Sequence, residues 1–342
     1  MKSRVLIIGP KYYHYLNACK HAFNELGWDT MVESYDNPVH PYTPLMKWQY
    51  KLSNNKAALQ HKSRMAYAAY IEKRFEEIRP DVVFIMNGDI LETATLDRFR
   101  QSAKVLLWLF DNRDKIPNSI AHADHVDCLF CFEQDDVDWF LAQGKHAYFL
   151  PQACDTSTYF PVTSAKDIDI LFVGVLYYSP RRQQIIHNLI HRFPHLRIVV
   201  FGTYKPWYKN PLKWLLREKR HIYKNRNIDS TEVNLYYNRS RIVLNIHQEQ
   251  QQNGANPRTF EISGSGAYQL CDANPYIESL FTNGEIGIYH NEDELYRLVE
   301  EAMADDKAPQ VQQAYNFVQA HHTFIVRIKE ALAIAHITTN SI

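Results

Sequence analysis

Short apolar runs of strand length alternate with longer segments of helical pattern along nearly the whole chain. Most of these runs are continuous, which is typical of parallel strands that are covered on both faces. The alternation therefore predicts βαβ units and an α/β fold built on parallel sheets. The predicted strands are 4–8, 81–86, 105–110, 127–132, 147–150, 168–173, 196–201, 241–246, 267–271 and 286–289, and the predicted helices are 15–26, 64–79, 134–143, 181–192, 231–239, 292–304 and about 310–336.

The pattern restarts once, near the middle of the chain. Residues 168–174 form an apolar run that ends in Gly174, as residues 5–9 do near the start, and tyrosine-rich sequence and a helical pattern follow each run. We expect two Rossmann-like doubly wound domains that face each other across a cleft, with ligands bound outside the carboxyl ends of the strands. The expected boundaries are 1–160 for the first domain, 161–320 for the second, and 321–342 for a terminal helix that returns to the first domain.

Charge balance and apolar content narrow the class of protein. Lys and Arg together number 38, as do Asp and Glu, so no net field favours nucleic acid. The apolar content of 46% is that of a globular chain. No apolar run reaches the ~20 residues that span a bilayer, and the opening run is too short for a signal peptide. We therefore expect a cytoplasmic protein. The five cysteines are odd in number and widely scattered, which argues against a disulfide framework, and the pair Cys128 and Cys131 lies in a strand-like run that favours core thiols over a metal or redox site.

A polar loop after the strand at 241–246 leads into a predicted helix that starts at Asn256. Asn256 is a favourable N-cap and Pro257 a favourable first helical residue. The unpaired N–H groups of such a helix start bind phosphate, and Arg258 adds a bidentate cation beside them. Glu261, one turn further on, could accept hydrogen bonds from the vicinal hydroxyls of a ribose. The pattern indicates a nucleoside diphosphate site, with an ordinary capped helix and a surface Arg and Glu as the alternative.

Three further residues that follow strands are candidates for acid–base chemistry or for contact with a ligand in the cleft. Asp111 follows the strand at 105–110 and could deprotonate an acceptor hydroxyl, or it could cap the next turn. His14, in the first loop after a strand, is the rival base, and it could instead stabilise a neighbouring tyrosine. His247 could contact the donor sugar, or it could be a loop histidine whose hydrogen bonds are satisfied within the protein.

The segment from Lys205 to Arg226 departs from the strand–helix rhythm. It carries eight basic residues against one acid, Glu218, and aromatic and leucine side chains are interleaved with them. Such a segment is typical of an amphipathic patch that contacts anionic lipid at a membrane surface or a polyanionic acceptor. A solvated helical insertion whose aromatic side chains pack on the protein is the alternative.

These residues resemble the CgeB-like (spore-maturation) glycosyltransferases, a GT-B group related to the group-1 glycosyltransferases. The most specific part of the resemblance is Arg258-Thr259-Phe260-Glu261, followed by Gly264 and Gly266. The resemblance extends over nearly the whole chain. Its further matches are Arg79-Pro80-Asp81, Trp108, Asp111, Gly144, Leu150-Pro151, Phe172-Val173-Gly174, Tyr177, Arg181, Leu270-Cys271-Asp272, Leu280-Phe281, Gly284, Asp293-Glu294-Leu295 and His322-Thr323-Phe324 with Arg327.

The resemblance implies a GT-B fold whose second domain binds a nucleotide-sugar donor. Glu261 would hold the ribose hydroxyls, Arg181 would face the diphosphate, and Arg258 would add to that clamp. Gly174 and Tyr177 would form the turn beside the donor. Enzymes of this fold stabilise the leaving diphosphate with basic residues and helix dipoles, so the resemblance implies no metal and no cofactor besides the nucleotide-sugar co-substrate.

Two positions depart from the family pattern and bear on the donor sugar and the stereochemical outcome. Asn253 stands where group-1 relatives often carry a second glutamate, and Val175 stands where an Arg usually follows the strand-ending glycine. We expect a metal-independent glycosyltransferase that moves a sugar from UDP, or from another nucleoside diphosphate, to an unknown glycan, polymer or protein acceptor. A nucleotide-sugar epimerase or hydrolase of the same fold is one alternative, and a non-catalytic nucleotide- or glycan-binding module is another.

Overall fold

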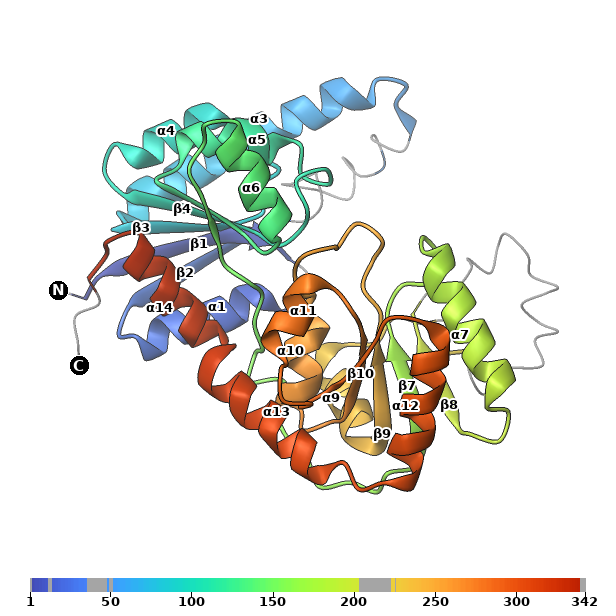
Figure 1. Cartoon of the computed structure of the whole chain (residues 1–342). Coiled ribbons are helices and arrows are strands. Elements are labelled where there is room, and N and C mark those ends of the chain that lie inside the picture. Colours follow the sequence, from blue (N-terminus) through green and yellow to red (C-terminus); the bar gives the residue numbers. More distant parts are fainter. Residues whose placement is uncertain are drawn as a thin grey trace. The chain divides into compact units, whose positions relative to one another are not determined.

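The computed structural model describes residues 2–11, 14–35, 48, 52–202, 223–224 and 226–338. The chain forms two compact α/β units, an N-terminal unit of Met1–Pro151 with Phe324–Ile342 and a C-terminal unit of Gln152–Thr323 (Figure 1). The sequence placed the first boundary at 160/161. Cys154 and Tyr159, which lie before that point, belong to the hydrophobic core of the C-terminal unit.

A six-stranded parallel sheet forms the centre of the N-terminal unit, in the order β2-β1-β3-β4-β5-β6. Its strands are β1 (Arg4–Pro10), β2 (Asp29–Tyr35), β3 (Val82–Met86), β4 (Lys104–Leu109), β5 (Cys128–Cys131) and β6 (Ala147–Phe149). Its helices are α1 (Tyr15–Glu25), α3 (Lys56–Ile78), α4 (Thr93–Arg100), α5 (Asn118–His122), α6 (Gln134–Ala142) and α14 (Phe324–Ile334). The sequence missed β2, because this edge strand is mostly half-buried and has no continuous apolar run.

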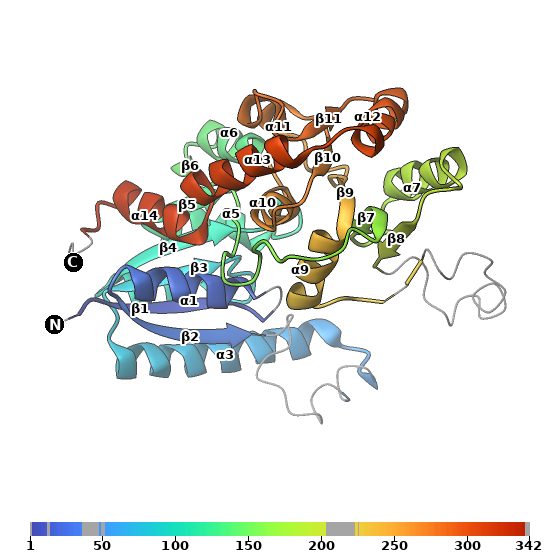
Figure 2. The ribbon, with the colours of Figure 1, turned by 90° about the horizontal axis from the view of Figure 1, so that it is seen from below.

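Helices cover both faces of this sheet, as a doubly wound fold requires. On one face, α3, α4 and α6 share a hydrophobic core with β1, β3, β4 and β5. On the other face, Phe23 of α1 packs edge-on against Phe84 of β3, and Phe324 of α14 packs against Trp108 of β4. The turned view in Figure 2 shows α1 and α14 close together. Burial on both faces explains the continuous apolar runs, because successive side chains of a strand point to opposite faces.

A five-stranded parallel sheet forms the centre of the C-terminal unit, in the order β11-β10-β9-β7-β8. Its strands are β7 (Ile168–Val173), β8 (Ile198–Phe201), β9 (Ser240–Asn245), β10 (Gln269–Asp272) and β11 (Gly287–Tyr289). Its helices are α7 (Pro180–Arg192), α9 (Ser230–Arg239), α10 (Pro257–Gly264), α11 (Pro275–Leu280), α12 (Glu292–Ala304) and α13 (Ala308–His321). Helices α7 and α12 pack on one face of the sheet, and α9, α10 and α13 pack on the other.

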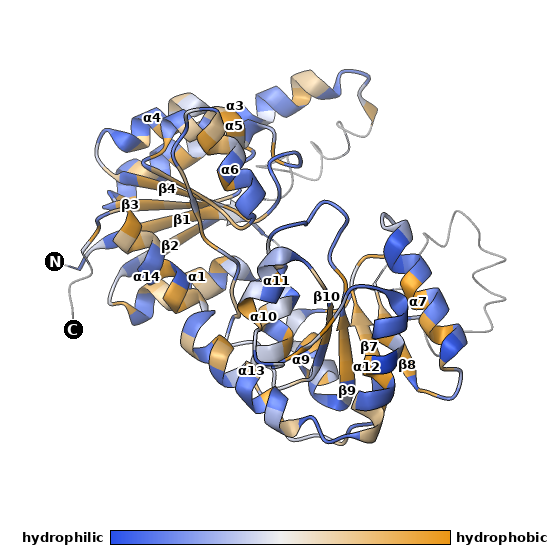
Figure 3. Ribbon diagram, in the orientation of Figure 1, coloured by the Kyte–Doolittle hydropathy of each residue, from blue (hydrophilic) through white to orange (hydrophobic). Residues whose placement is uncertain are grey.

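The strands of both sheets are the most hydrophobic segments of the fold, and the helices carry polar residues between apolar ones (Figure 3). All five cysteines are buried thiols, including Cys128 and Cys131, for which core positions were predicted. Among the described residues, no helix has the length and apolar character that crossing a membrane requires.

The single terminal helix predicted at about 310–336 is wrong, because the structure has two helices there. Helix α13 ends at His321, and α14 begins at Phe324. Between them the chain leaves the helix to form a parallel bridge with Cys154, whose N–H donates to the carbonyl of His322 at 2.8 Å. The ring of His322 is buried and stacks on Phe260 at 4.7 Å between centroids, so it is a core residue rather than helix surface.

Gly264, the first glycine of the predicted family motif, has a packing role. A Cβ atom at this position would lie 2.4 Å from Sγ of Cys154. We expect Gly264→Ala to lower the free energy of unfolding by roughly 1–3 kcal/mol, since the added methyl overpacks the core. Urea unfolding followed by circular dichroism measures the change. In a Cys154→Ala background the same substitution should cost much less, and an equal cost in both backgrounds would contradict the contact.

Candidate functional site

The carboxyl ends of β7, β9 and β10 lie next to one another, because these strands are parallel neighbours in the C-terminal sheet. Helix α7 starts shortly after β7, and α10 starts after the loop that follows β9. Ligands of Rossmann-like sheets bind at this edge. The candidate donor site comprises the side chains of Arg181, Arg182, His247, Asn256, Arg258, Glu261 and Asp272.

Asn256 fixes the start of α10. Its side-chain oxygen accepts the backbone N–H of Thr259 at 3.1 Å, and Pro257 follows in the first turn, so the predicted N-cap and helix start are confirmed. The Asn256 amide donates to Asn245 of β9 at 2.9 Å. Asn245 in turn donates to Thr259 at 3.1 Å and to Gln269 of β10 at 2.9 Å. This buried amide network ties the helix start to the last residue of β9 and to the first residue of β10.

Asp272, at the end of β10, is the centre of a second buried network. Its Oδ1 accepts from Nδ1 of His247 at 2.7 Å and from the backbone N–H of the same residue at 2.9 Å. Its Oδ2 accepts from Nη1 of Arg181 at 2.8 Å. Burial alone would raise the pKa of this carboxyl, but the hydrogen bonds and charge of His247, together with Arg181, hold the pKa of Asp272 below its usual value.

His247 connects this carboxylate to α10. Its Nδ1 faces Asp272 and so carries the proton, while Nε2 lies 3.4 Å from the backbone nitrogen of Asn256 and accepts its hydrogen. Both ring nitrogens of His247 are therefore used inside the C-terminal unit. The sequence left two alternatives for His247, a contact with the donor sugar or a loop histidine whose hydrogen bonds are satisfied within the protein. Its side chain is only 3% exposed, and its geometry is that of the second alternative.

Arg182 is a buried cation that the sequence reasoning did not select. Its guanidinium donates to the carbonyl of Ile246 at 3.0 and 2.5 Å and to that of Val175 at 3.2 Å, so it lies between the loops after β9 and β7. Two causes lower the pKa of Arg182 to about 10: burial, which is the larger, and repulsion from the guanidinium of Arg258. Arg182 is in helical phase with the buried Ile185 and Ile186 of α7, and this phase could have identified it from the sequence.

Arg181, which the family resemblance placed opposite the diphosphate, pairs with Asp272, and its side chain is 43% exposed. Gly174 lies where β7 ends, and its carbonyl would be 1.9 Å from a Cβ atom at Gly202, so two loops cross closely there. Tyr177 follows in the same turn and packs edge-on against Tyr178 at 4.6 Å between centroids. These residues shape the turn between β7 and α7.

Arg258 and Glu261 belong to one group of interacting side chains on α10. Arg258 is half-buried and Glu261 is buried, so neither points freely into solvent. Both act on the buried phenol of Tyr237: burial and the charge of Glu261 raise the pKa of that phenol, and Arg258 opposes them. The helix start thus combines a carboxylate with two neighbouring guanidinium groups, those of Arg258 and Arg182.

His247, Cys271 and Asp272 also have the composition of a metal site, with ligand atoms within 4.8 Å of one another. Their chemistry does not fit a bound ion. Both oxygens of Asp272 already accept N–H groups, and the guanidinium of Arg181 balances its charge. Burial raises the pKa of the Cys271 thiol, which opposes the thiolate that a metal needs.

In the N-terminal unit, Asp111 follows β4, and Asn87 follows β3. Asn87 is buried with φ of 61°; its side chain accepts the N–H of Phe110 at 2.7 Å and donates to Oδ2 of Asp111 at 3.2 Å. This amide therefore holds the Asp111 carboxylate at the carboxyl end of the sheet, where the sequence expected a base.

His14, the rival base, is the exposed residue before α1, with φ of 58°. It lines a cavity of about 350 Å³ at the carboxyl end of β1, together with Pro10, Lys11 and Asn17. The neighbouring tyrosines 12 and 13 lie outside the described residues. Of the basic segment from Lys205 to Arg226, the structure describes only Tyr223, Lys224 and Arg226, so the predicted membrane patch lies largely outside the described residues.

Residues 181–333 match the model of a glycosyl transferase-like family. The matched region begins at the start of α7 and includes Asn256, Arg258, Glu261 and Asp272. No curated protein sequence matches the chain.

Solved structures resemble the whole chain. Sucrose-phosphate synthase from Thermosynechococcus elongatus has a TM-score of 0.69 at 9% identity, covering 98% of this chain and 99% of its own. HepE from Anabaena, solved with UDP and glucose, has a TM-score of 0.65 at 9% identity, and the match covers 98% of this chain and 100% of HepE. A Listeria monocytogenes protein described as a UDP-N-acetylglucosamine 2-epimerase has a TM-score of 0.61 at 12% identity, and the match covers 98% of this chain and 97% of that protein. The predicted GT-B fold is confirmed.

The role of His247 as a link can be tested by stability. We expect His247→Ala to lower the free energy of unfolding by roughly 2–4 kcal/mol, because it opens a cavity and leaves buried groups of Asp272 and Asn256 with fewer partners. Exposed His290, which pairs with Glu278 and Glu294, is the matched control, and its Ala variant should change stability little. Urea unfolding of both variants is the measurement, and equal losses would argue against the link.

Proposed function

We propose that this protein is a metal-independent glycosyltransferase that moves a sugar from a nucleoside diphosphate, with UDP the best-supported carrier, to an acceptor hydroxyl. The observation that carries the proposal is the capped start of α10 at the sheet edge, with Arg258 and Glu261 on its first turns and buried Arg182 beside them. The family match over these residues and the fold shared with HepE, solved with UDP and glucose, support it.

The diphosphate would lie between Arg182 and Arg258. The two guanidinium groups repel each other, and Arg182 donates to the backbone carbonyls of Ile246 and Val175. An anion placed between them would relieve this repulsion and would receive charge-assisted hydrogen bonds. The carbonyl contacts hold the Arg182 side chain in place before a ligand arrives, so little ordering is needed on binding.

The sugar-bearing nucleoside would extend towards Glu261. An ionised carboxylate accepts hydrogen bonds only, which suits the two vicinal hydroxyls of a ribose. Catalysis would then come from holding donor and acceptor together and from stabilising the charge that develops on the leaving diphosphate. Asp111, oriented by Asn87, would take the proton from the acceptor hydroxyl. The CgeB-like group is the family we propose for the chain.

The adjacent arginines of α7 offer a matched test of the diphosphate contact. We expect Arg182→Gln to weaken UDP binding by roughly 1–3 kcal/mol, about 5- to 150-fold, because a buried charged hydrogen bond to phosphate is lost. Arg181→Gln should change the affinity much less, since Asp272 already engages that side chain. Isothermal titration calorimetry gives the dissociation constants. A larger loss of UDP affinity for Arg181→Gln than for Arg182→Gln would show that Arg181, as the resemblance implied, contacts the diphosphate.

Arg258→Ala and Glu261→Ala extend this test to α10 and do not depend on the fold of α7. Each should weaken UDP binding by roughly 1–3 kcal/mol. Unfolding midpoints near that of the unmodified chain would show that the loss concerns binding. Unchanged affinity in both variants would remove the proposed donor site.

Asp111→Asn tests the general base. We expect it to lower the rate of nucleoside diphosphate release in the presence of acceptor by roughly 100-fold or more, with donor affinity unchanged, because a neutral amide cannot take the proton. His14→Gln is the comparison variant, and the larger loss identifies the base. Full activity of Asp111→Asn would exclude Asp111.

Release of nucleoside diphosphate from a panel of sugar donors separates the candidate functions. Release that depends on an acceptor supports transfer, whereas release without acceptor supports a hydrolase. Interconversion of the donor sugar would support an epimerase, a class represented by the description of the Listeria structure. Binding without turnover would support a non-catalytic module.

A further inference from the structure

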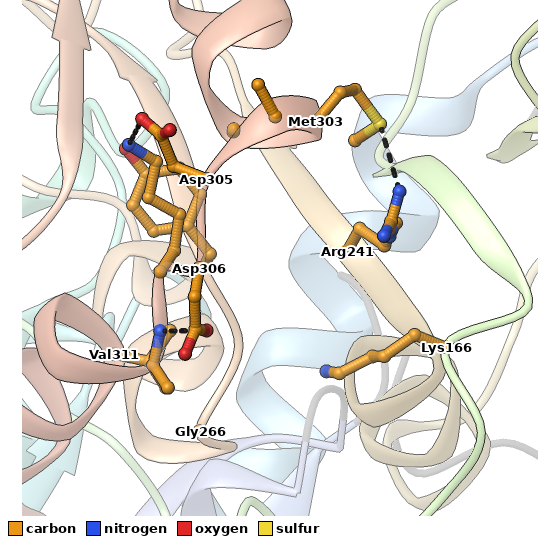
Figure 4. A pocket seen from close by; sticks show the side chains of 12 residues that line it. Lys166, Arg241, Gly266, Met303, Asp305, Asp306 and Val311 are labelled. Atoms are coloured by element: carbon orange, nitrogen blue, oxygen red, sulfur yellow. Dashed lines mark hydrogen bonds and ion pairs between the residues drawn. The ribbon is translucent and has the colours of Figure 1, made fainter.

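A cavity opens at the edge of the C-terminal sheet that lies opposite the candidate donor site. It has a volume of about 520 Å³ and lies at the amino ends of β7, β9 and β10, whereas the candidate donor site lies at their carboxyl ends. Its walls come from Lys166 before β7, Arg241 in β9, Tyr268 before β10, and the connection between α12 and α13. Figure 4 shows Lys166 pointing into this cavity, with Asp305 and Asp306 on the opposite wall.

Lys166 and Arg241 have no carboxylate partner among the described residues. Arg241 contacts Sδ of Met303 at 3.8 Å. Other cations at this edge are paired: Arg197 and Arg239 both bind Asp167, at 3.0 and 2.6 Å. Two positive charges at the cavity therefore lack the compensation that their neighbours have.

The acids on the opposite wall are already engaged. Asp305 lies 3.4 Å from the ammonium of Lys307, and Asp306 accepts the backbone N–H of Ala308 at 3.0 Å. They do not neutralise the cations across the cavity by direct contact. Lys166 and Arg241 are both exposed, so a ligand in solution can reach them.

The remaining wall is apolar. Met303 and Val311 line it, and the buried ring of Tyr268 lies under the ammonium of Lys307, 5.8 Å from it. A cavity of this volume is within the range that small-molecule ligands occupy, and its mixture of apolar wall and a few convergent charges is typical of such sites.

We propose that this cavity is a second ligand site, which binds a small molecule with an anionic group and an apolar or aromatic body. Lys166 and Arg241 hold the phosphate or carboxylate, and the body packs against Met303 and Tyr268. The inference is independent of the proposed glycosyltransferase function, because the residues belong to the other edge of the sheet.

Phenyl phosphate is the probe that tests the site. We expect the full chain to bind it saturably in calorimetric titration, and the double variant Lys166→Gln, Arg241→Gln to bind about tenfold or more weakly, since two charged hydrogen bonds are lost. Saturating UDP should leave the affinity unchanged. Phenol, which lacks the anion, should bind far more weakly than phenyl phosphate.

Arg197→Gln is the matched control, because it removes a paired cation from the same edge and should leave the affinity unchanged. The single variants Lys166→Ala and Arg241→Ala should each show part of the loss, which keeps the test decisive if the double variant unfolds. Absence of saturable binding, equal affinity in the charge variants, or displacement by UDP would overturn the proposal. Loss of UDP binding in Arg258→Ala with phenyl phosphate binding retained would keep the two sites distinct.

Discussion

The carboxylate of Asp272 holds together the edge of the C-terminal sheet on which the candidate donor site depends. It receives hydrogen bonds from the loop after β9 through His247 and from the start of α7 through Arg181. The other ring nitrogen of His247 accepts a hydrogen bond from the backbone N–H of Asn256, the N-cap of α10. A buried carboxylate is stable only when its hydrogen bonds and charge are satisfied, so these elements are fixed together before any ligand binds. Such preorganisation is what stabilisation of a leaving diphosphate requires.

The two adjacent arginines at the start of α7 have different partners. Arg181 balances the charge of Asp272, while Arg182 turns towards the sheet and contacts two loop carbonyls. Successive residues of a helix point about 100° apart, so two neighbours cannot serve the same contact. The start of α7 thus places one guanidinium on the buried carboxylate and the other near Arg258.

Buried asparagines perform a similar task in both units. Asn245 ties the start of α10 to β9 and β10, and Asn87 ties the carboxyl ends of β3 and β4 while it orients Asp111. An amide carries both a donor and an acceptor, so one side chain can bridge two backbone segments without a buried charge. In each sheet a candidate site residue follows a strand whose end is fixed by such an amide.

Sequence alone determined the parallel α/β architecture and the capped start of α10, because continuous apolar runs and an Asn-Pro helix start are local properties. It missed β2, whose edge position leaves it half-buried, and it joined α13 to α14, since the break at His322 depends on a bridge to distant Cys154. Only the tertiary structure decided which carbonyls the inward-facing Arg182 contacts and that His247 bridges Asp272 and Asn256. Their partners come from other strands and loops, and contacts between segments far apart in the chain leave no pattern in the sequence around either residue.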